Sequence, residues 1–306
     1  MKILYVFIGI LATLLFVGGP DYESSRLIQY TWDTGHLYLF AAVAYALLAS
    51  RKIPGENQLK IIIIITASSF AVGFLIEVVQ LYFNRDFELH DVLNDVLGAL
   101  IGYILFRIIQ SKQSLLRQKI KIGILLVLLL SGFCQLLGVI VDEFMMREEF
   151  PVLADFEYTN QLSRWDNKRA KISLSKQHVR EGKNSLKVIF LPDEFPDITL
   201  QHFPHDWSGY HDIGFSLFNP VENGPMNIEL KIYDKAHIKN SYAYNDRFNQ
   251  VFSLHPGWND IVVSLDDVFN APAGRIMDRK KIKSFSLFLS DVTKPVKIFI
   301  DDLKLF

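Results

Sequence analysis

The chain has 306 residues, of which 50% are hydrophobic and 21% charged, with a formal net charge of −1 at pH 7. This composition excludes an intrinsically disordered chain, and the single cysteine, Cys134, excludes a small disulfide-stabilised scaffold. The near-neutral net charge gives no indication of a basic surface that would bind nucleic acid. The charges are unevenly placed, because residues 1–141 hold 11 Lys/Arg and 9 Asp/Glu whereas residues 142–306 hold 21 and 24. The chain therefore joins an apolar half to a polar half.

The apolar half contains five segments that predict membrane-spanning helices. A helix that crosses the hydrocarbon core needs about 20 apolar residues. We expect spans at about residues 1–19, 32–50, 60–83, 89–109 and 121–141. The first segment begins with a charge, Lys2, as a signal peptide does, but Gly18-Gly19-Pro20 follows it instead of a small-x-small cleavage site. An uncleaved span is therefore favoured, and a cleaved signal peptide is the alternative.

The loop charges predict the orientation of these spans. With the N-terminus in the cytoplasm, nine Lys or Arg residues fall in inside segments, and only Arg26 and Arg85 fall in outside segments. An excess of basic residues marks cytoplasmic loops. We therefore expect a multi-pass membrane protein in contact with membrane lipid, with an extracytoplasmic C-terminal domain.

Polar side chains within the predicted spans gather at their outer ends. The candidate ligand-binding residues there are Asp33, His36, Glu77, Gln80, Arg85, Asp91, Asn94 and Asp95. Charged groups inside a membrane are costly, which makes them functional candidates. The alternative is that those nearest the span ends only reach into the lipid headgroups. We expect an outward-facing polar pocket, with Asp33, His36, Glu77 and Asp91 as its catalytic candidates if the protein is an enzyme.

One face of the fourth predicted span carries both acids and glycines. Asp91, Asp95, Gly98 and Gly102 follow one another in steps of four, three and four residues, which places them on one side of a helix. Two glycines four residues apart let a neighbouring helix approach closely. This face is therefore predicted to contact another helix.

The segment IEVVQLYFNRDFELHDVLNDVLGALIG, together with DTGHLYLF upstream, resembles the VanZ-like membrane proteins over about residues 30–110. The similar features are Glu-x-x-Gln, Arg-x-Phe, Asp-Val and a glycine-rich helix, preceded by Asp-x-x-His. The chain departs from the family at Asp95, where the family usually has Asn, so an amide role there would pass to Asn94. The resemblance implies a bacterial inner (cytoplasmic) membrane protein with an envelope function, a family associated with resistance to the glycopeptide teicoplanin.

From residue 153 onward the pattern predicts an all-β sandwich domain, and the acidic segment 142–152 predicts a tether. Short β-rich segments are separated by turn residues such as Asn-Gly-Pro and Pro-Gly. The expected strands are Ala170–Leu174, Ser185–Phe190, Ile213–Phe218, Asn227–Tyr233, Asp260–Leu265, Ser284–Leu289 and Lys297–Leu305. The fold class is thus a membrane all-α bundle of about five helices plus an all-β jelly-roll sandwich.

The blocks DFEYTNQLSRW, HVREGKNSLKV, DWSGYHDIGFSLFNP, HPGWNDIVVSLDD and IFIDDLKLF resemble, in that order, jelly-roll carbohydrate-binding modules of the galactose-binding-like type. The resemblance covers about residues 153–306 and implies glycan binding. It also implies a structural calcium, with Glu157, Asp301 and the backbone of Gly182 and Lys183 as ligands. Hard oxygen ligands from distant segments are what Ca²⁺ requires. The alternative is that Asp301 only solvates the last strand.

Aromatic residues are the candidate sugar-stacking groups. Tyr242 and Tyr244 alternate, which would direct both rings to one face of a strand, and Phe248 follows them. Packing against a face of the sandwich is the alternative role for these rings.

No recognised catalytic motif is present, so a non-enzymatic role is favoured. The leading hypothesis is an envelope protein whose membrane part handles an amphipathic or lipid-linked glycan, and whose outer module binds glycan, in glycopeptide resistance or envelope polysaccharide assembly. One alternative is an intramembrane enzyme or carrier that acts on lipid-linked envelope precursors. The other is that the sandwich docks a protein.

Overall fold

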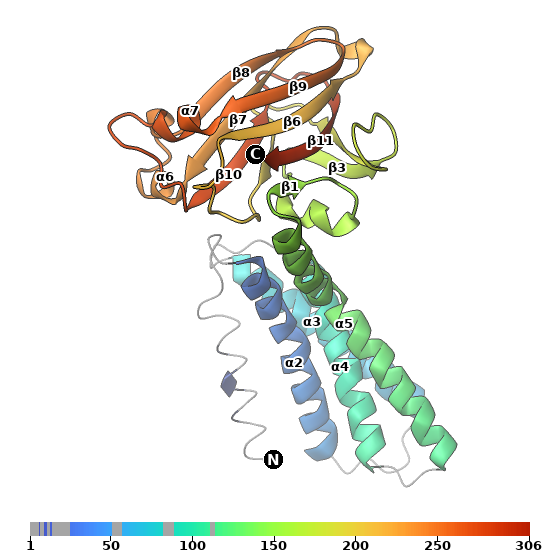
Figure 1. The fold of residues 1–306 in the computed structure, drawn as a ribbon. Helices are drawn as coiled ribbons and strands as arrows, with labels where there is room; N and C mark the ends of the chain where they lie inside the picture. The colour runs from blue at the N-terminus through green and yellow to red at the C-terminus, as the bar shows by residue number, and fades with distance from the viewer. Residues whose placement is uncertain are drawn as a thin grey trace. The chain divides into compact units, whose positions relative to one another are not determined.

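The computed structural model describes residues 6, 9, 10, 13, 25–50, 57–81, 89–110 and 114–306. The chain divides into two compact units, Met1–Ile140 and Val141–Phe306. The described part of the first unit is helical, and the second is built mainly from strands (Figure 1).

The helices of the first unit are α2 (Arg26–Ser50), α3 (Gln58–Gln80), α4 (Leu89–Gln110) and the part of α5 (Leu115–Glu149) up to Ile140. Among the described residues, three of these helices, α3, α4 and α5, are long and apolar enough to cross a membrane. The second predicted span corresponds to most of α2, which does not pass that test and carries Arg26, Asp33 and His36. The first predicted span falls almost wholly outside the described residues. Three of the five expected spans therefore correspond to candidate membrane-spanning helices, and the count of about five is not confirmed.

Helix α4 is the most enclosed of the apolar helices. In its most apolar stretch 44% of the residues are buried, against 17% in α3 and 6% in α5, and it packs against both α2 and α3. Gly98 and Gly102 make the approach of α2 possible, because a Cβ on either would overlap a backbone carbonyl oxygen, of Leu37 or of Ala41. The glycines predicted to face a helix therefore do so.

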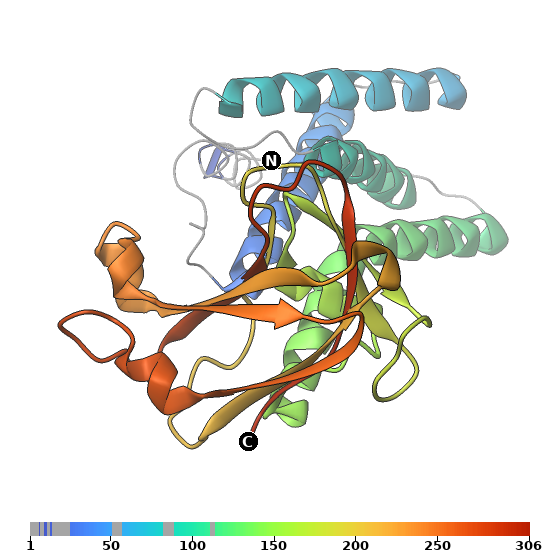
Figure 2. The same ribbon diagram turned by 90° about the horizontal axis from the view of Figure 1, so that it is seen from above.

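The second unit is an all-β sandwich, as predicted. One sheet has the order β3-β4-β11-β6-β9, with β1 paired to β11, and the other has the order β2-β5-β10-β7-β8. The strands of the first sheet are β1 (Val152–Ala154), β3 (Ala170–Ser175), β4 (Ser185–Phe190), β6 (Asp212–Asn219), β9 (Gly257–Ser264) and β11 (Val296–Leu305). Those of the second are β2 (Trp165–Asp166), β5 (Asp197–Leu200), β7 (Met226–Asp234), β8 (Phe248–Leu254) and β10 (Ile282–Phe288). Every pairing is antiparallel, and Figure 2 shows the strands from a second direction.

Alternation along the strands builds the core between the two sheets. In β7, Ile228, Leu230 and Ile232 are buried in the core, and the residues between them face the other side. The outer face of the second sheet is thus free to present polar side chains.

Short helical segments connect the strands: η2 (Thr159–Arg164), η3 (Val221–Asn223), α6 (Lys235–Lys239), η4 (Tyr244–Asp246) and α7 (Leu265–Asn270).

The segment predicted to be a tether is helical through Glu149, as the end of α5. Asp142 lies in this end and forms a buried ion pair with Arg164, whose guanidinium also donates to the Leu153 carbonyl at 3.0 Å. Both partners belong to the second unit. The acids of this segment therefore include a structural one, because burying Arg164 without Asp142 would leave a charge unpaired.

Candidate functional site

A cluster of buried ionisable side chains lies between α2, α3 and α4. His36 of α2, Glu77 of α3, and Asp91 and Asp95 of α4 are each at most 3% exposed. Glu77 lies one turn before the end of α3, and Asp91 lies in the first turn of α4. Because α4 packs against both other helices, these positions meet. The sequence predicted that these four residues would share a site, and the structure brings them together.

Each ring nitrogen of His36 lies near a carboxylate. Its Nδ1 lies 3.0 Å from Oδ1 of Asp95, within hydrogen-bond distance, and its Nε2 lies 3.5 Å from Oδ2 of Asp91. The ligand atoms of His36, Glu77 and Asp91 all lie within 4.8 Å of one another. Asp95 also packs closely on α3, since a Cβ on Gly73 would overlap its carboxylate. The spacing of Asp91 and Asp95 therefore places both acids on the face that meets His36.

The remaining predicted residues of this site divide into three groups. Gln80 lies one turn after Glu77 and is 1% exposed, and Asn94 directly precedes Asp95 and is 4% exposed, so both are buried. Asp33 is only partly buried, one turn before His36 on α2. Arg85 lies outside the described residues.

The cluster is rich in ionisable groups for a buried site. Three carboxylates and one imidazole share this space. A buried charge is costly unless it is neutralised by a partner, a proton or a metal ion. Such an arrangement is suited to proton exchange or to cation binding, both of which occur at functional sites in membranes.

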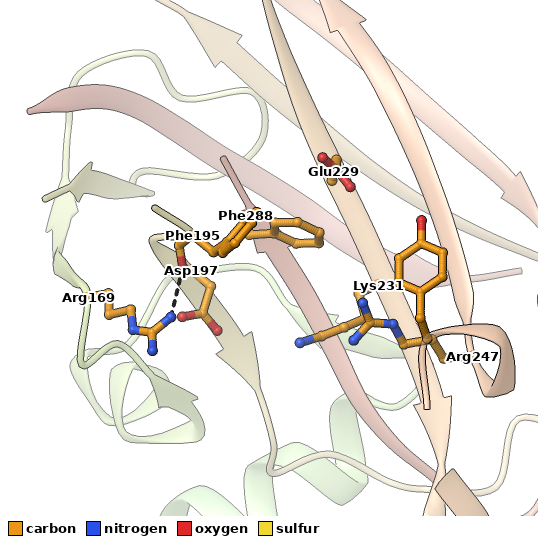
Figure 3. A pocket seen from close by; sticks show the side chains of 8 residues that line it. Arg169, Phe195, Asp197, Glu229, Lys231, Arg247 and Phe288 are labelled. Carbon is orange, nitrogen blue, oxygen red and sulfur yellow. Dashed lines mark hydrogen bonds between the residues drawn. The ribbon is translucent and has the colours of Figure 1, made fainter. Parts of the chain in front are cut away.

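The sandwich contains a separate polar cleft of about 350 Å³ on the outer side of the second sheet (Figure 3). Its lining residues are Arg169, Phe195, Asp197, Glu229, Lys231, Tyr244, Arg247 and Phe288. Glu229 and Lys231 face it because they alternate with the core residues of β7, and Phe288 ends β10 beside them. Figure 3 shows Arg169 and Asp197 on one side of the cleft and Lys231 and Arg247 on the other.

Cations outnumber acids in this cleft by three to two. Burial, together with the nearby Arg247, lowers the pKa of Lys231. Arg247 lies with its Cζ 5.1 Å from the centre of the Tyr244 ring, and its Nε has no hydrogen-bond partner among the described residues. Arg169 donates to the Phe195 carbonyl at 3.1 Å. The cleft therefore holds a partly desolvated positive group next to an aromatic ring.

The three candidate sugar-stacking residues of the sandwich differ in their structural positions. The expectation that Tyr242 and Tyr244 lie on a strand is wrong, because Tyr242 has a positive φ of 57° and Tyr244 begins η4. Tyr244 is 63% exposed and lines the cleft, whereas Tyr242 contacts the rings of Tyr233 and His237. Phe248 begins β8 and is buried in the core. Alternation failed here because a turn separates the residues from the strand.

The four residues predicted to hold calcium meet at one loop. Oε1 of Glu157 accepts from the backbone N–H groups of Lys183 and Asn184 at 2.7 and 2.9 Å, and Gly182, with φ of 72°, has no room for a Cβ beside Glu157. Asp301 accepts from the N–H groups of Arg180 and Glu181. Calcium needs oxygen ligands, and the groups facing these carboxylates are N–H donors. The arrangement does not fit calcium as it stands, and the calcium site stays a prediction.

A buried ionic network in the sandwich had no signal in the sequence. Arg275 pairs with both Asp234 and Asp246, whose side chains are 1% and 10% exposed, and Asp246 also lies 3.3 Å from Nδ1 of His237. Hydrogen bonds from Arg275 lower the pKa of Asp246 to about 2. The partners are 29 and 41 residues from Arg275 along the chain. Asp234 ends β7, Asp246 ends η4 and Arg275 follows α7, so the folding of these segments onto one another brings the three side chains together.

A protein-family model matches part of the first unit. Residues 7–110, about a third of the chain, match the VanZ/LLP1 family model. That range contains all four acidic and imidazole side chains of the cluster. No curated protein matches the chain.

Solved structures similar to the chain match its C-terminal part. One is a family 11 carbohydrate-binding module from Clostridium thermocellum in complex with a β-1,3-1,4-mixed-linked tetrasaccharide, with 18% identity, a TM-score of 0.37, and coverage of 51% of this chain and 94% of that chain. Another is the C-terminal family 22 module of Clostridium thermocellum Xyn10B, with 11% identity, a TM-score of 0.32, and coverage of 49% and 89%. A third is an exo-β-agarase, with 15% identity, a TM-score of 0.40, and coverage of 51% and 24%. The chain therefore joins a VanZ-like region, at residues 7–110, to a β-sandwich.

Proposed function

We propose that the protein is a cell-envelope membrane protein whose sandwich binds an acidic glycan in the cleft of the second sheet. The observation that carries this proposal is the combination of Tyr244, Phe195 and Phe288 with three cations in one cleft of about 350 Å³. Aromatic rings stack on the apolar faces of pyranose rings, and guanidinium groups pair with carboxylate or phosphate oxygens in two parallel hydrogen bonds. A charged glycan uses both features.

Glycan binding is tested with the full chain in lipid nanodiscs. We expect binding to an array of acidic glycans, such as uronate polymers and phosphate-bearing wall polymers, above binding to neutral glucans. Affinity for the acidic glycans falls with added salt, because the contacts are partly exposed ion pairs. Binding of neutral glucans alone would contradict the acidic specificity, and binding of no glycan would favour the alternative that the sandwich docks a protein.

For the helical unit, we propose that the buried cluster of His36, Glu77, Asp91 and Asp95 handles an amphipathic or lipid-linked envelope ligand. The match to the VanZ/LLP1 family model and the burial of these four side chains support this role. The Glu77→Gln and Asp91→Asn variants test it in cells, with membrane insertion confirmed and teicoplanin susceptibility measured. An unchanged phenotype in both variants would argue against a role for the cluster.

A second candidate function is an intramembrane enzyme or carrier acting on a lipid-linked precursor, with Glu77, Asp91 and Asp33 as its acids. A carboxylate near each nitrogen of His36 favours it, because a positioned imidazole can exchange protons near neutral pH. Turnover or translocation of a lipid-linked sugar by the purified protein would distinguish this activity from binding alone.

The orientation is also a proposal: N-terminus in the cytoplasm and sandwich outside. It rests on the distribution of basic residues between loops. Phosphatase and fluorescent-protein fusions after Phe306 test it, since an exported end supports phosphatase activity and a cytoplasmic end supports fluorescence.

A further inference from the structure

We propose that His36, Glu77 and Asp91 form a binding site for one divalent transition-metal ion inside the helical unit. This inference does not rest on glycan binding by the sandwich. The three side chains come from three different helices, α2, α3 and α4, and all are buried. Imidazole nitrogen and carboxylate oxygen are the ligands that zinc and its neighbours in the first transition row accept.

The separation of the ligand atoms suits a shared ion better than a direct hydrogen bond. Nε2 of His36 lies 3.5 Å from Oδ2 of Asp91, whereas hydrogen bonds between nitrogen and oxygen cluster at about 2.7–3.2 Å. Two ligands at about 2.0–2.1 Å from a tetrahedral ion lie about 3.4 Å apart. Ligand atoms of all three residues lie within 4.8 Å of one another. The geometry is therefore that of a site into which an ion fits with small movements of the side chains.

The hydrogen bonding of His36 directs Nε2 toward the ion. Nδ1 lies 3.0 Å from Oδ1 of Asp95, and Nε2 has no hydrogen-bond partner among the described residues although His36 is only 1% exposed. A histidine that ligates a metal through one nitrogen commonly donates its other N–H to a carboxylate, which fixes the tautomer. Asp95 is thus the positioning residue, and it is buried completely.

The charges of the ligands also suit a divalent ion, because the two carboxylates of Glu77 and Asp91 would balance its two positive charges. Three protein ligands leave a fourth position open, as in catalytic rather than structural zinc sites. The ligand that takes this position would offer an oxygen atom, such as water or a phosphate oxygen of a lipid headgroup.

The test measures metal content and affinity for the full chain, purified in nanodiscs without a polyhistidine tag. After incubation with Zn²⁺ and removal of free metal, inductively coupled plasma mass spectrometry is expected to find about one zinc per wild-type chain. The His36→Gln, Glu77→Gln and Asp91→Asn variants are expected to lose this zinc. The matched control is His90→Gln, which removes a partly buried histidine of α4 beside Asp91 and outside the three ligands. This variant is expected to keep the zinc.

The positioning role of Asp95 has its own readout. The Asp95→Asn variant keeps a group that accepts from Nδ1, and loss of such an outer carboxylate lowers metal affinity by about 10- to 100-fold while leaving one site per chain. Co²⁺ loaded in place of Zn²⁺ is expected to give visible absorption typical of four- or five-coordinate cobalt, which the Asp91→Asn variant loses. A wild-type chain that binds no zinc at micromolar concentration, or a His36→Gln variant that is folded and keeps its zinc, overturns the proposal.

Discussion

Removal of the Arg247 guanidinium is expected to weaken binding of an acidic glycan without unfolding the sandwich. Arg247 lies over the Tyr244 ring in the cleft, and its Nε has no hydrogen-bond partner among the described residues. The Arg247→Ala variant therefore leaves no partner of Nε unpaired. A hydrogen bond to a charged group contributes about 1.5–3 kcal/mol. At about 1.4 kcal/mol for each factor of ten, the dissociation constant should rise roughly 10- to 150-fold.

The matched control is Arg279→Ala, because Arg279 also lies over an aromatic ring of the sandwich, Phe269, with its Cζ 4.7 Å from the ring centre, but outside the cleft. Isothermal titration calorimetry with the full chain in nanodiscs gives the dissociation constants at two salt concentrations. We expect Arg279→Ala to match the wild type. Equal losses in the two variants, or an Arg247→Ala variant with unchanged affinity for acidic glycan, would refute the assignment of the cleft.

Three further outcomes follow from contacts in the two units. Arg275→Leu leaves Asp234 and Asp246 buried without their cation, so unfolding of the sandwich should become easier by about 3 kcal/mol. Because Arg275 lowers the pKa of Asp246 to about 2, the ionised Asp246 stabilises the wild-type sandwich. The wild type should lose about 2 kcal/mol of this stability as the pH falls from about 4 to 2, and the variant should not. A parallel loss in both proteins would contradict this. Gly98→Ala should destabilise the helical unit by about 1–3 kcal/mol of overpacking, seen as a lower melting temperature, because its Cβ meets the Leu37 carbonyl. Gly35→Ala, with open space around it, should have no such cost. Glu157→Gln loses charge-assisted bonds from two N–H groups, and denaturant unfolding should show about 2 kcal/mol of destabilisation both in EDTA and in calcium, with exposed Glu222→Gln as the control. A destabilisation confined to calcium-containing buffer would instead support the predicted metal site.

Several features of both units could be predicted from the sequence because they depend on local periodicity. The length of the apolar runs predicted α3, α4 and the apolar part of α5, and the steps between Asp91, Asp95, Gly98 and Gly102 predicted a single helix face. The β-rich segments predicted strands at seven positions of the sandwich. The strands that the sequence missed, β1, β2, β5 and β8, are short or polar on one side, so that their own residues carry little signal.

The sites needed more than periodicity. The residue types of His36, Glu77, Asp91 and Asp95 were recognisable in the sequence, since charges in apolar helices are rare. Which nitrogen of His36 meets which acid was not, because the answer depends on how α2 and α3 pack against α4. The cleft shows the same limit: Tyr244 was a candidate, but Lys231, Arg169 and Arg247 became neighbours only through strand pairing and loop placement.

The sequence by itself determined that the protein has an apolar helical part and a polar β part, because hydrophobicity and residue period act over a few neighbouring residues. The tertiary structure decided which charged groups neutralise one another. Arg275 with Asp234 and Asp246, Arg164 with Asp142, and His36 with Asp95 are all joined across long separations in the chain. Burial makes such pairing obligatory, yet its partners are selected by the packing of whole helices and sheets, which no local pattern records.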